Sequence, residues 1–211
     1  MRYRYLMILL AALALAACSS STEEADVHYD WQARNAQWFA EKYDSAMTAI
    51  TEAKAVYPDG NEWQQHCDGW RLYRTLQKSQ DVQGASTDYI VCKVLESGTG
   101  KDEDRPNLTD SVRLVYRAWL MDVNYPQSKD NVSIFSQSYY GTYDARTTVG
   151  LEMPVLSTVE GFQNALQYMT PGDSWLIYIP QELAYGEESS DAVPAYSTLL
   201  YNIRLLGVIR R

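Results

Sequence analysis

Apolar residues recur at helical spacing in the first part of the chain. The pattern predicts a helix from Asp26 to Ala55, ended by the turn-forming run Tyr57-Pro58-Asp59-Gly60. Its apolar stripe contains Trp31, Trp38, Phe39, Ala46, Met47, Ile50 and Ala53. We expect this stripe to cover the domain that follows, with pairing to a second copy as the alternative. Residues 61–80 are rich in aromatic and aliphatic side chains, but no period decides between helix and strand.

From Thr87 onward the period changes to two, which is typical of strands. Asp88–Glu96 and Ser111–Met121 read as strands, and a long polar loop follows the second. Residues 133–144 and 147–156 are strand-like but poorly bounded. The last strand is predicted at Thr198–Leu206. Inward-facing positions are predicted at Val112, Leu114, Tyr116, Ala118, Leu120, Trp175, Ile177, Ile179, Leu199, Tyr201, Ile203 and Leu205.

One short helix interrupts these strands. Ser157 and Glu160 have the spacing of a capping box, and the run 170–172, Thr-Pro-Gly, would end the helix. Its apolar stripe consists of Val159, Phe162, Leu166 and Met169. The predicted fold class is therefore α+β: an antiparallel half-barrel sheet wrapped around one short helix and preceded by a helical N-terminal segment.

The N-terminus has the pattern of an export signal. Arg2 and Arg4 precede a short apolar run that is too short for a permanent membrane span. The run ends in Leu-Ala-Ala-Cys18, which resembles a bacterial lipobox, so Cys18 is the predicted lipidation site; an ordinary cleaved signal is the alternative. We predict a signal peptide at 1–17, a lipidated tether at 18–28, a helical region at 29–85 and one domain at 86–211. The expected location is the cell envelope, lipid-anchored in the outer membrane, on the periplasmic or the surface side.

Composition narrows the classes of partner and cofactor. The net charge is −9 and no basic run occurs, which argues against nucleic acid as a partner. Beyond Cys18 only Cys67 and Cys92 remain, and the sequence leaves open whether they form a disulfide. The two histidines, His28 and His66, have no metal-ligand spacing with cysteine, and no glycine-rich phosphate loop occurs. We expect neither a metal nor another cofactor.

The C-terminal half resembles a known family. The stretch "VEGFQNALQYMTPGDSWLIYIPQELAYG", followed by "VPAYSTLLYNIRLL", is similar to the end of the FKBP-type peptidyl-prolyl cis-trans isomerase domain. "YIVCKVLESGTGK" and "TDSVRLVYRAWL" resemble its first strands. The resemblance covers about residues 86–211, and with the lipobox it is similar to exported lipoprotein members of the family in two-membrane bacteria.

The resemblance implies a proline-binding pocket between sheet and helix. It implies that Tyr185 hydrogen-bonds a substrate carbonyl from the loop above, that the backbone N–H near Val159 binds another carbonyl, and that Phe162 forms the floor. These three residues are the predicted catalytic residues. The implied substrate-binding positions are Tyr116, Phe135, Ser136, Thr158, Val193 and Tyr201.

The chain departs from the family pattern at one pocket position. Ser136 stands where family members commonly have an aspartate, and the loop 121–133 and the segment 147–156 align poorly. The implied function is peptidyl-prolyl cis-trans isomerisation during folding of exported proteins, with proline-containing segments as partners. The alternative is a binding or chaperone module of the same fold with weak or no isomerase activity. The sequence decides neither the client proteins, nor the residue preferred before proline, nor the oligomeric state.

Overall fold

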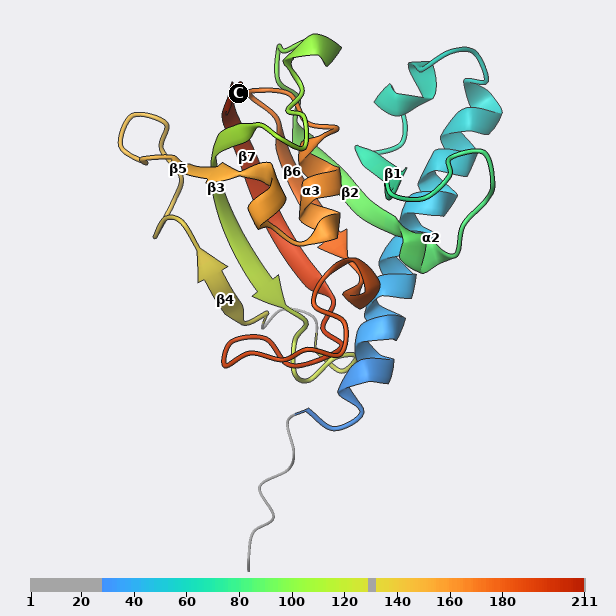
Figure 1. Ribbon diagram of the computed structural model, residues 1–211. Coiled ribbons are helices and arrows are strands. Elements are labelled where there is room, and N and C mark those ends of the chain that lie inside the picture. Colours follow the sequence, from blue (N-terminus) through green and yellow to red (C-terminus); the bar gives the residue numbers. More distant parts are fainter. Residues whose placement is uncertain (1–27, 129–131, 211) are drawn as a thin grey trace, which may run out of the picture.

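The computed structural model describes residues 28–128 and 132–210 (Figure 1). The predicted signal peptide, the lipidation candidate Cys18 and the tether as far as residue 27 lie outside the described residues, so these remain predictions. Within the described ranges, no helix is both long and apolar enough to cross a membrane.

The described chain forms one seven-stranded sheet in which every pairing is antiparallel. The strand order is β1-β2-β6-β7-β3-β4, and β5 pairs with the other end of β3. The strands are β1 Trp70–Arg74, β2 Tyr89–Glu96, β3 Ser111–Leu120, β4 Ile134–Gln137, β5 Leu151–Pro154, β6 Ser174–Ile179 and β7 Leu199–Ile209.

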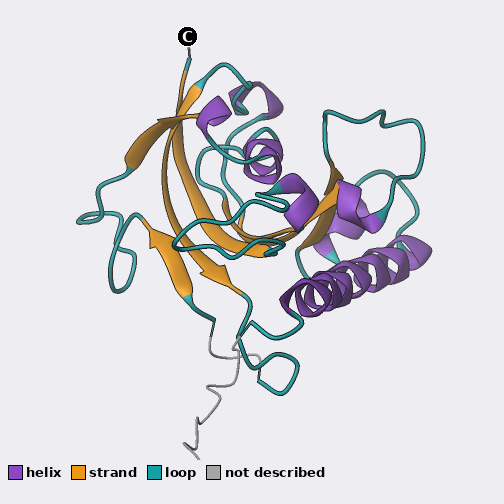
Figure 2. Ribbon diagram, turned by 60° about the horizontal axis from the view of Figure 1, so that its bottom comes forward, coloured by secondary structure: helices purple, strands orange, loops and turns teal. Residues whose placement is uncertain are grey.

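Two α-helices lie on opposite sides of this sheet. Helix α3, Glu160–Leu166, lies in the hollow of the curved sheet, and α2, Trp31–Val56, lies outside it (Figure 2). Short 3-10 turns occur at η1 Glu62–Gln65, η2 Ser86–Asp88, η3 Asp102–Asp104, η4 Val155–Ser157 and η5 Gln181–Leu183. The arrangement confirms the predicted α+β class, including the helical N-terminal segment.

The core lies between α3 and the concave face of the sheet. Phe162, Ala165 and Leu166 point from the helix into this space and are at most 3% exposed. A glycine is required where the helix meets β6, because a Cβ at Gly161 would lie 2.3 Å from the Ile179 side chain. The predicted inward strand positions are all buried except Tyr116, which is half-buried. Period-two patterning therefore identified the core face correctly.

The predicted capping box of α3 is wrong. Val159 is the N-cap residue, and no side chain caps the helix. The Ser157 hydroxyl instead donates to the Pro154 carbonyl at 2.7 Å, within the preceding turn η4. The Glu160 carboxylate accepts a hydrogen bond from the Thr75 hydroxyl, next to the end of β1. Ser157 and Glu160, whose spacing suggests a local cap, thus form hydrogen bonds outside the helix.

The strand-like segment after the polar loop is shorter than predicted. Only Ile134–Gln137 pairs with β3, because the chain then folds back over the outer face of the sheet. There the Arg117 guanidinium lies 4.7 Å from the Tyr139 ring centroid, and the Arg204 guanidinium lies 4.7 Å from the Tyr143 ring centroid. The aromatic residues that made this segment resemble a longer strand therefore form cation–π contacts instead of strand pairs.

Helix α2 covers the outer face of the same sheet. Trp38 meets Tyr178 of β6 edge-on with the ring centroids 5.6 Å apart, and Tyr43 meets Tyr89 of β2 at 5.8 Å. Most of the predicted stripe is buried, but Met47 is 36% exposed and does not belong to it. The aromatic stripe therefore packs against the domain of its own chain, as expected.

The segment of ambiguous pattern, residues 61–80, contains both a turn and a strand. It forms η1 and then β1, whose residues pair with β2 from Trp70↔Lys93 to Arg74↔Tyr89. The sheet thus begins before residue 86. The predicted domain boundary between residues 85 and 86 remains a prediction, which a variant truncated at that point would test.

The two cysteines of the body are free thiols, both buried. The Cys67 sulfur receives a hydrogen bond from the Arg71 guanidinium at 2.9 Å and donates to the Trp70 carbonyl at 3.2 Å. Burial raises the pKa of Cys92 well above its ordinary value. The disulfide that the sequence left open is not formed.

The first turn of α2 is hydrogen-bonded to the segment that enters β7. The Asn35 side chain, 1% exposed, accepts the Thr198 N–H at 2.9 Å and donates to the Trp31 carbonyl at 2.9 Å. The Trp31 indole N–H donates to the Ser197 hydroxyl at 2.9 Å. These contacts hold the segment between Val193 and β7 against the helix.

We expect Asn35→Ala to destabilise the fold by about 1–3 kcal/mol, because it leaves the buried Thr198 N–H without an acceptor. Urea unfolding followed by circular dichroism measures this change. Gln37→Ala removes an exposed amide from the same helix and is the matched control, expected to stay close to wild type. Equal unfolding midpoints for the two variants would mean that the hydrogen bonds between α2 and the segment before β7 do not stabilise the fold.

Candidate functional site

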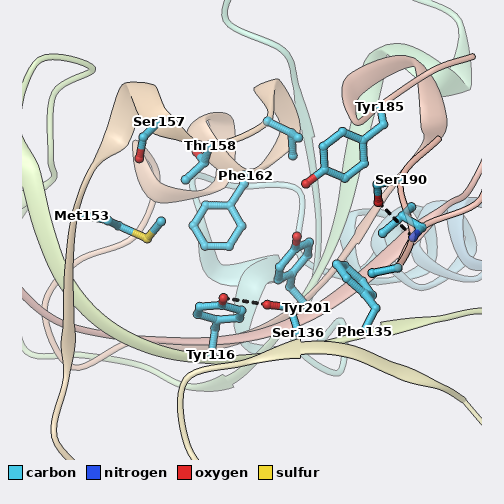
Figure 3. A pocket seen from close by; sticks show the side chains of 13 residues that line it. Tyr116, Phe135, Ser136, Met153, Ser157, Thr158, Phe162, Tyr185, Ser190 and Tyr201 are labelled. Atoms are coloured by element: carbon cyan, nitrogen blue, oxygen red, sulfur yellow. Dashed lines mark hydrogen bonds between the residues drawn. The ribbon is translucent and has the colours of Figure 1, made fainter. Parts of the chain in front are cut away.

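A cavity of about 500 Å³ opens between the start of α3 and the concave face of the sheet. Its lining side chains converge from the start of α3, from strands β3, β4, β5 and β7, and from the loop after η5 (Figure 3). All nine pocket residues predicted from the sequence line it: Tyr116, Phe135, Ser136, Thr158, Val159, Phe162, Tyr185, Val193 and Tyr201. The structure therefore brings these residues to one place, while the role of each remains a prediction.

Two buried aromatic rings line the cavity. Phe162 comes from the first turn of α3 and is 3% exposed, and Tyr201 comes from β7 and is 7% exposed. Their rings meet edge-on with the centroids 5.0 Å apart. The alternation of β7 turns Tyr201 inward with Leu199 and Ile203, and its position beside the helix start places it at the open end of the core.

One wall is formed by neighbouring residues of β3 and β4. The hydroxyls of Tyr116 and Ser136 are 2.8 Å apart and hydrogen-bonded (Figure 3). Phe135 lies beside them and meets the Tyr201 ring edge-on at 5.9 Å. A register shift between Ala118 and Trp119 accompanies this pairing of the two strands. Ser136 thus contacts the tyrosine of the wall through a hydroxyl, without adding a charge.

Tyr185 lies above the cavity because the chain turns sharply after β6. Pro180 ends that strand, η5 follows, and Gly186 takes a left-handed conformation with φ 58°. The Gly186 N–H donates to the Gln181 carbonyl at 2.9 Å, and its carbonyl accepts the Tyr196 N–H at 2.7 Å. Tyr185 is 43% exposed, and its hydroxyl points over the cavity (Figure 3). A turn that glycine permits therefore places this ring at the rim.

The start of α3 supplies the opposite rim. The Thr158 hydroxyl donates to the Val155 carbonyl at 2.9 Å. The methyl group and the backbone of Thr158 are therefore the parts that can contact a ligand. Val159 is in extended conformation at the N-cap, and its carbonyl accepts the Phe162 and Gln163 N–H groups at 3.0 Å. No described residue accepts a hydrogen bond from the Val159 N–H.

The cavity is electrically neutral. No charged side chain is among the described residues that line it. Burial raises the pKa of Tyr201 well above its ordinary value, and the nearby Tyr185 and Tyr116 hydroxyls raise it further. The phenol is therefore protonated at any physiological pH and can donate a hydrogen bond. Such a site suits a neutral, partly apolar ligand that carries hydrogen-bond acceptors.

Four lining residues were not found from the sequence: Met153, Ser157, Ser190 and Ala192. Met153 belongs to β5, in the segment that the resemblance aligned poorly. Ser190 and Ala192 belong to the irregular loop after Gly186, where the Ser190 hydroxyl accepts the Val193 N–H at 3.1 Å. Neither segment has a hydrophobic period. Nearness in sequence to Val193 could have suggested Ser190 and Ala192, and its place before the helix could have suggested Ser157.

Comparison with known proteins agrees with this geometry. Residues 102–206 match the family described as FKBP-type peptidyl-prolyl cis-trans isomerase. The chain therefore carries a domain that belongs to this family. The match includes α3, β6, the Tyr185 loop and most of β7, which together supply much of the cavity.

Three individual proteins illustrate the similarity. The peptidyl-prolyl cis-trans isomerase Mip of Coxiella burnetii is 30% identical over 67% of this chain and 54% of its own length. The outer membrane protein MIP of Legionella longbeachae is 28% identical over 55% of this chain and 42% of its own length. A solved peptidyl-prolyl cis-trans isomerase from Pseudomonas syringae covers 81% of this chain and 96% of its own, with 21% identity and TM-score 0.46. The chain thus spans about half the length of these two curated relatives.

We expect Phe162→Ala to destabilise the domain by about 3–5 kcal/mol, because it removes a buried ring from both the core and the pocket floor. Phe162→Trp should be tolerated, since its larger ring can extend into the cavity. Chemical denaturation of the three proteins measures these differences. An alanine variant as stable as wild type would show that this ring is not part of the core.

Proposed function

We propose that the chain is a peptidyl-prolyl cis-trans isomerase that acts on proline-containing segments of exported proteins. The observation that carries the proposal is the neutral aromatic cavity of an FKBP-type domain, with Phe162 beneath it and Tyr185 above it. A proline ring is small and apolar and is flanked by two carbonyl oxygens, so it matches an apolar floor with donors at the rim. The Coxiella relative carries the name of this activity.

Such a reaction needs no nucleophile, metal or charged acid. The X–Pro bond rotates against a barrier of about 20 kcal/mol that amide resonance sets. Twisting the bond reduces the polarity of its carbonyl, so an apolar pocket disfavours the planar amide more than the twisted one. A thousandfold acceleration requires about 4 kcal/mol of preference for the twisted state. Phe162, Tyr201 and Phe135 supply the apolar surroundings in which that preference arises.

The alternative is a proline-binding or chaperone module with little turnover. Ser136 favours it, because family members commonly have an aspartate at this position. In this chain the Ser136 hydroxyl is hydrogen-bonded to Tyr116, so the wall is closed without a carboxylate. The described residues of this wall therefore carry no negative charge.

For location, we propose a lipid anchor at Cys18 that holds the domain at the cell envelope. The signal-like N-terminus and the lipobox-like run before Cys18 support this proposal. The name of the Legionella relative, an outer membrane protein, agrees with it. The described part of the chain would then act outside the cytoplasm on segments that emerge during export.

We expect Tyr185→Phe to weaken peptide turnover or binding by about 1 kcal/mol, which is several-fold, because one neutral hydrogen bond is lost. The fold should not change, since the ring keeps its packing. NMR exchange spectroscopy on a proline peptide measures both cis–trans exchange and binding. Wild-type values in the variant would remove Tyr185 from the proposed site.

The same assay separates the enzyme from the binding module through Ser136→Asp. If the missing carboxylate limits the rate, this variant should isomerise faster than wild type. The Tyr116 hydroxyl is at hand to donate to the new carboxylate, which limits the cost of placing a charge there. The enzyme proposal fails if neither protein accelerates exchange while the peptide still binds in a Tyr185-dependent way.

For the anchor, we expect wild type to partition with membranes or detergent and Cys18→Ser to remain unlipidated and incompletely processed. Fractionation and mass spectrometry of the N-terminal peptide test this directly. Recovery of both proteins as soluble, identically processed chains would contradict the proposed anchor.

A further inference from the structure

The hydroxyl of Tyr201 forms no hydrogen bond with the described residues. The residue is 7% exposed and its ring is held between Phe162 and Phe135, at centroid distances of 5.0 and 5.9 Å. Its hydroxyl points up into the cavity, toward the space that the Tyr185 hydroxyl also faces (Figure 3). No described residue forms a hydrogen bond with it, whereas the Tyr116 hydroxyl is bonded to Ser136.

This hydroxyl restricts what the cavity can bind. In the empty cavity the hydroxyl can be hydrated, but a ring that enters the cavity displaces that water. A buried hydroxyl left without a partner lowers affinity by roughly tenfold or more. The ring alone would form the same floor as a phenylalanine, so the cost is avoided only if the ligand brings an acceptor with it.

A prolyl segment brings two acceptors near its ring. These are the carbonyl oxygen of the residue before proline and the carbonyl oxygen of the proline itself. The ring carries no acceptor, and the lone pair of its nitrogen is delocalised while the amide is planar. The proposed function requires the bond before proline to lie inside the cavity, whereas the chain after proline must leave over the rim. Tyr201, the more buried of the two tyrosine donors, therefore meets the carbonyl before proline.

We propose that Tyr201 is a substrate-binding residue whose hydroxyl donates a hydrogen bond to the carbonyl oxygen of the residue before proline. The inference rests on the proposed function and adds a second tyrosine donor to its site. A hydrogen bond to this oxygen is strongest when the amide is planar, because the carbonyl is then most polar. Tyr201 therefore contributes to binding of the ground state rather than to rotation of the bond.

The first test separates KM from kcat. Tyr201→Phe should raise KM, and the Kd of a non-turned-over peptide, by about three- to tenfold while kcat stays equal or rises. Tyr178→Phe is the matched control, because Tyr178 has the same 7% exposure but packs against Trp38 on the other face of the sheet. It should behave as wild type. An unchanged KM, or a lower kcat at unchanged KM, overturns the inference.

The second test identifies the acceptor. Replacing the carbonyl oxygen before proline by sulfur weakens it as an acceptor and leaves the backbone otherwise intact. Wild type should bind the oxo peptide several-fold more tightly than this thioxo peptide, and Tyr201→Phe should bind the two about equally. A thioxo group placed at the proline carbonyl should not couple to Tyr201. Equal discrimination by both proteins at the first position overturns the inference.

Failure of this inference is distinguishable from failure of the proposed function. If wild type isomerises the peptide and Tyr201→Phe matches it in KM and kcat, only the role of Tyr201 is wrong. If wild type neither binds nor isomerises proline peptides, the proposed function is wrong and the inference is overturned with it.

Discussion

A seven-residue helix cannot fill the hollow of a seven-stranded sheet, and the pocket is the space that remains. Helix α3 packs closely because Gly161 has no Cβ to meet Ile179, and Leu166 then fills the hollow below. Beyond the start of the helix a cavity of about 500 Å³ opens over the concave face. Phe162 belongs to both regions, as a core residue and as the pocket floor. The stability of the domain and the shape of its pocket therefore depend on the same contact.

The chemistry of the pocket follows from what its walls lack. Rotation about a prolyl bond needs no charged group, and the described residues that line this cavity offer no charged side chain. Side-chain polarity enters through hydroxyl groups, which differ in their hydrogen bonding. The hydroxyls of Tyr116 and Ser136 are bonded to each other, that of Tyr185 stands at the rim, and that of Tyr201 points into the cavity from a buried ring. The Tyr185 and Tyr201 hydroxyls have no partner among the described residues, so a ligand can use them as it can use the Val159 N–H.

The N-terminal helix bears on this pocket from the far side of the sheet. Asn35 and Trp31 hold the segment that links Val193 of the pocket wall to β7. Ala192 and Val193 line the pocket and come shortly before the residues that α2 holds. The position of this wall therefore depends on a helix outside the family match at 102–206. With a lipid anchor at Cys18, the tether would end close to the contacts of Trp31 and Asn35, since α2 begins at Trp31.

Sequence patterns alone determined the fold class and most of the pocket. Period-two alternation predicted the inward faces of β3, β6 and β7, because the side chains of a strand alternate between its two faces. The family resemblance predicted nine lining residues, because its motifs are short local stretches of sequence. The capping box failed, because Glu160 bonds Thr75, which is 85 residues away. The strand at 70–74, the free state of Cys67 and Cys92, and the lining role of Met153 were likewise decided only in three dimensions. Each depends on which distant segment lies alongside, and a local pattern carries no information about that partner. The direction of the Tyr201 hydroxyl is of the same kind: alternation turns the ring inward, but only the unfilled end of the hollow leaves its oxygen facing a cavity.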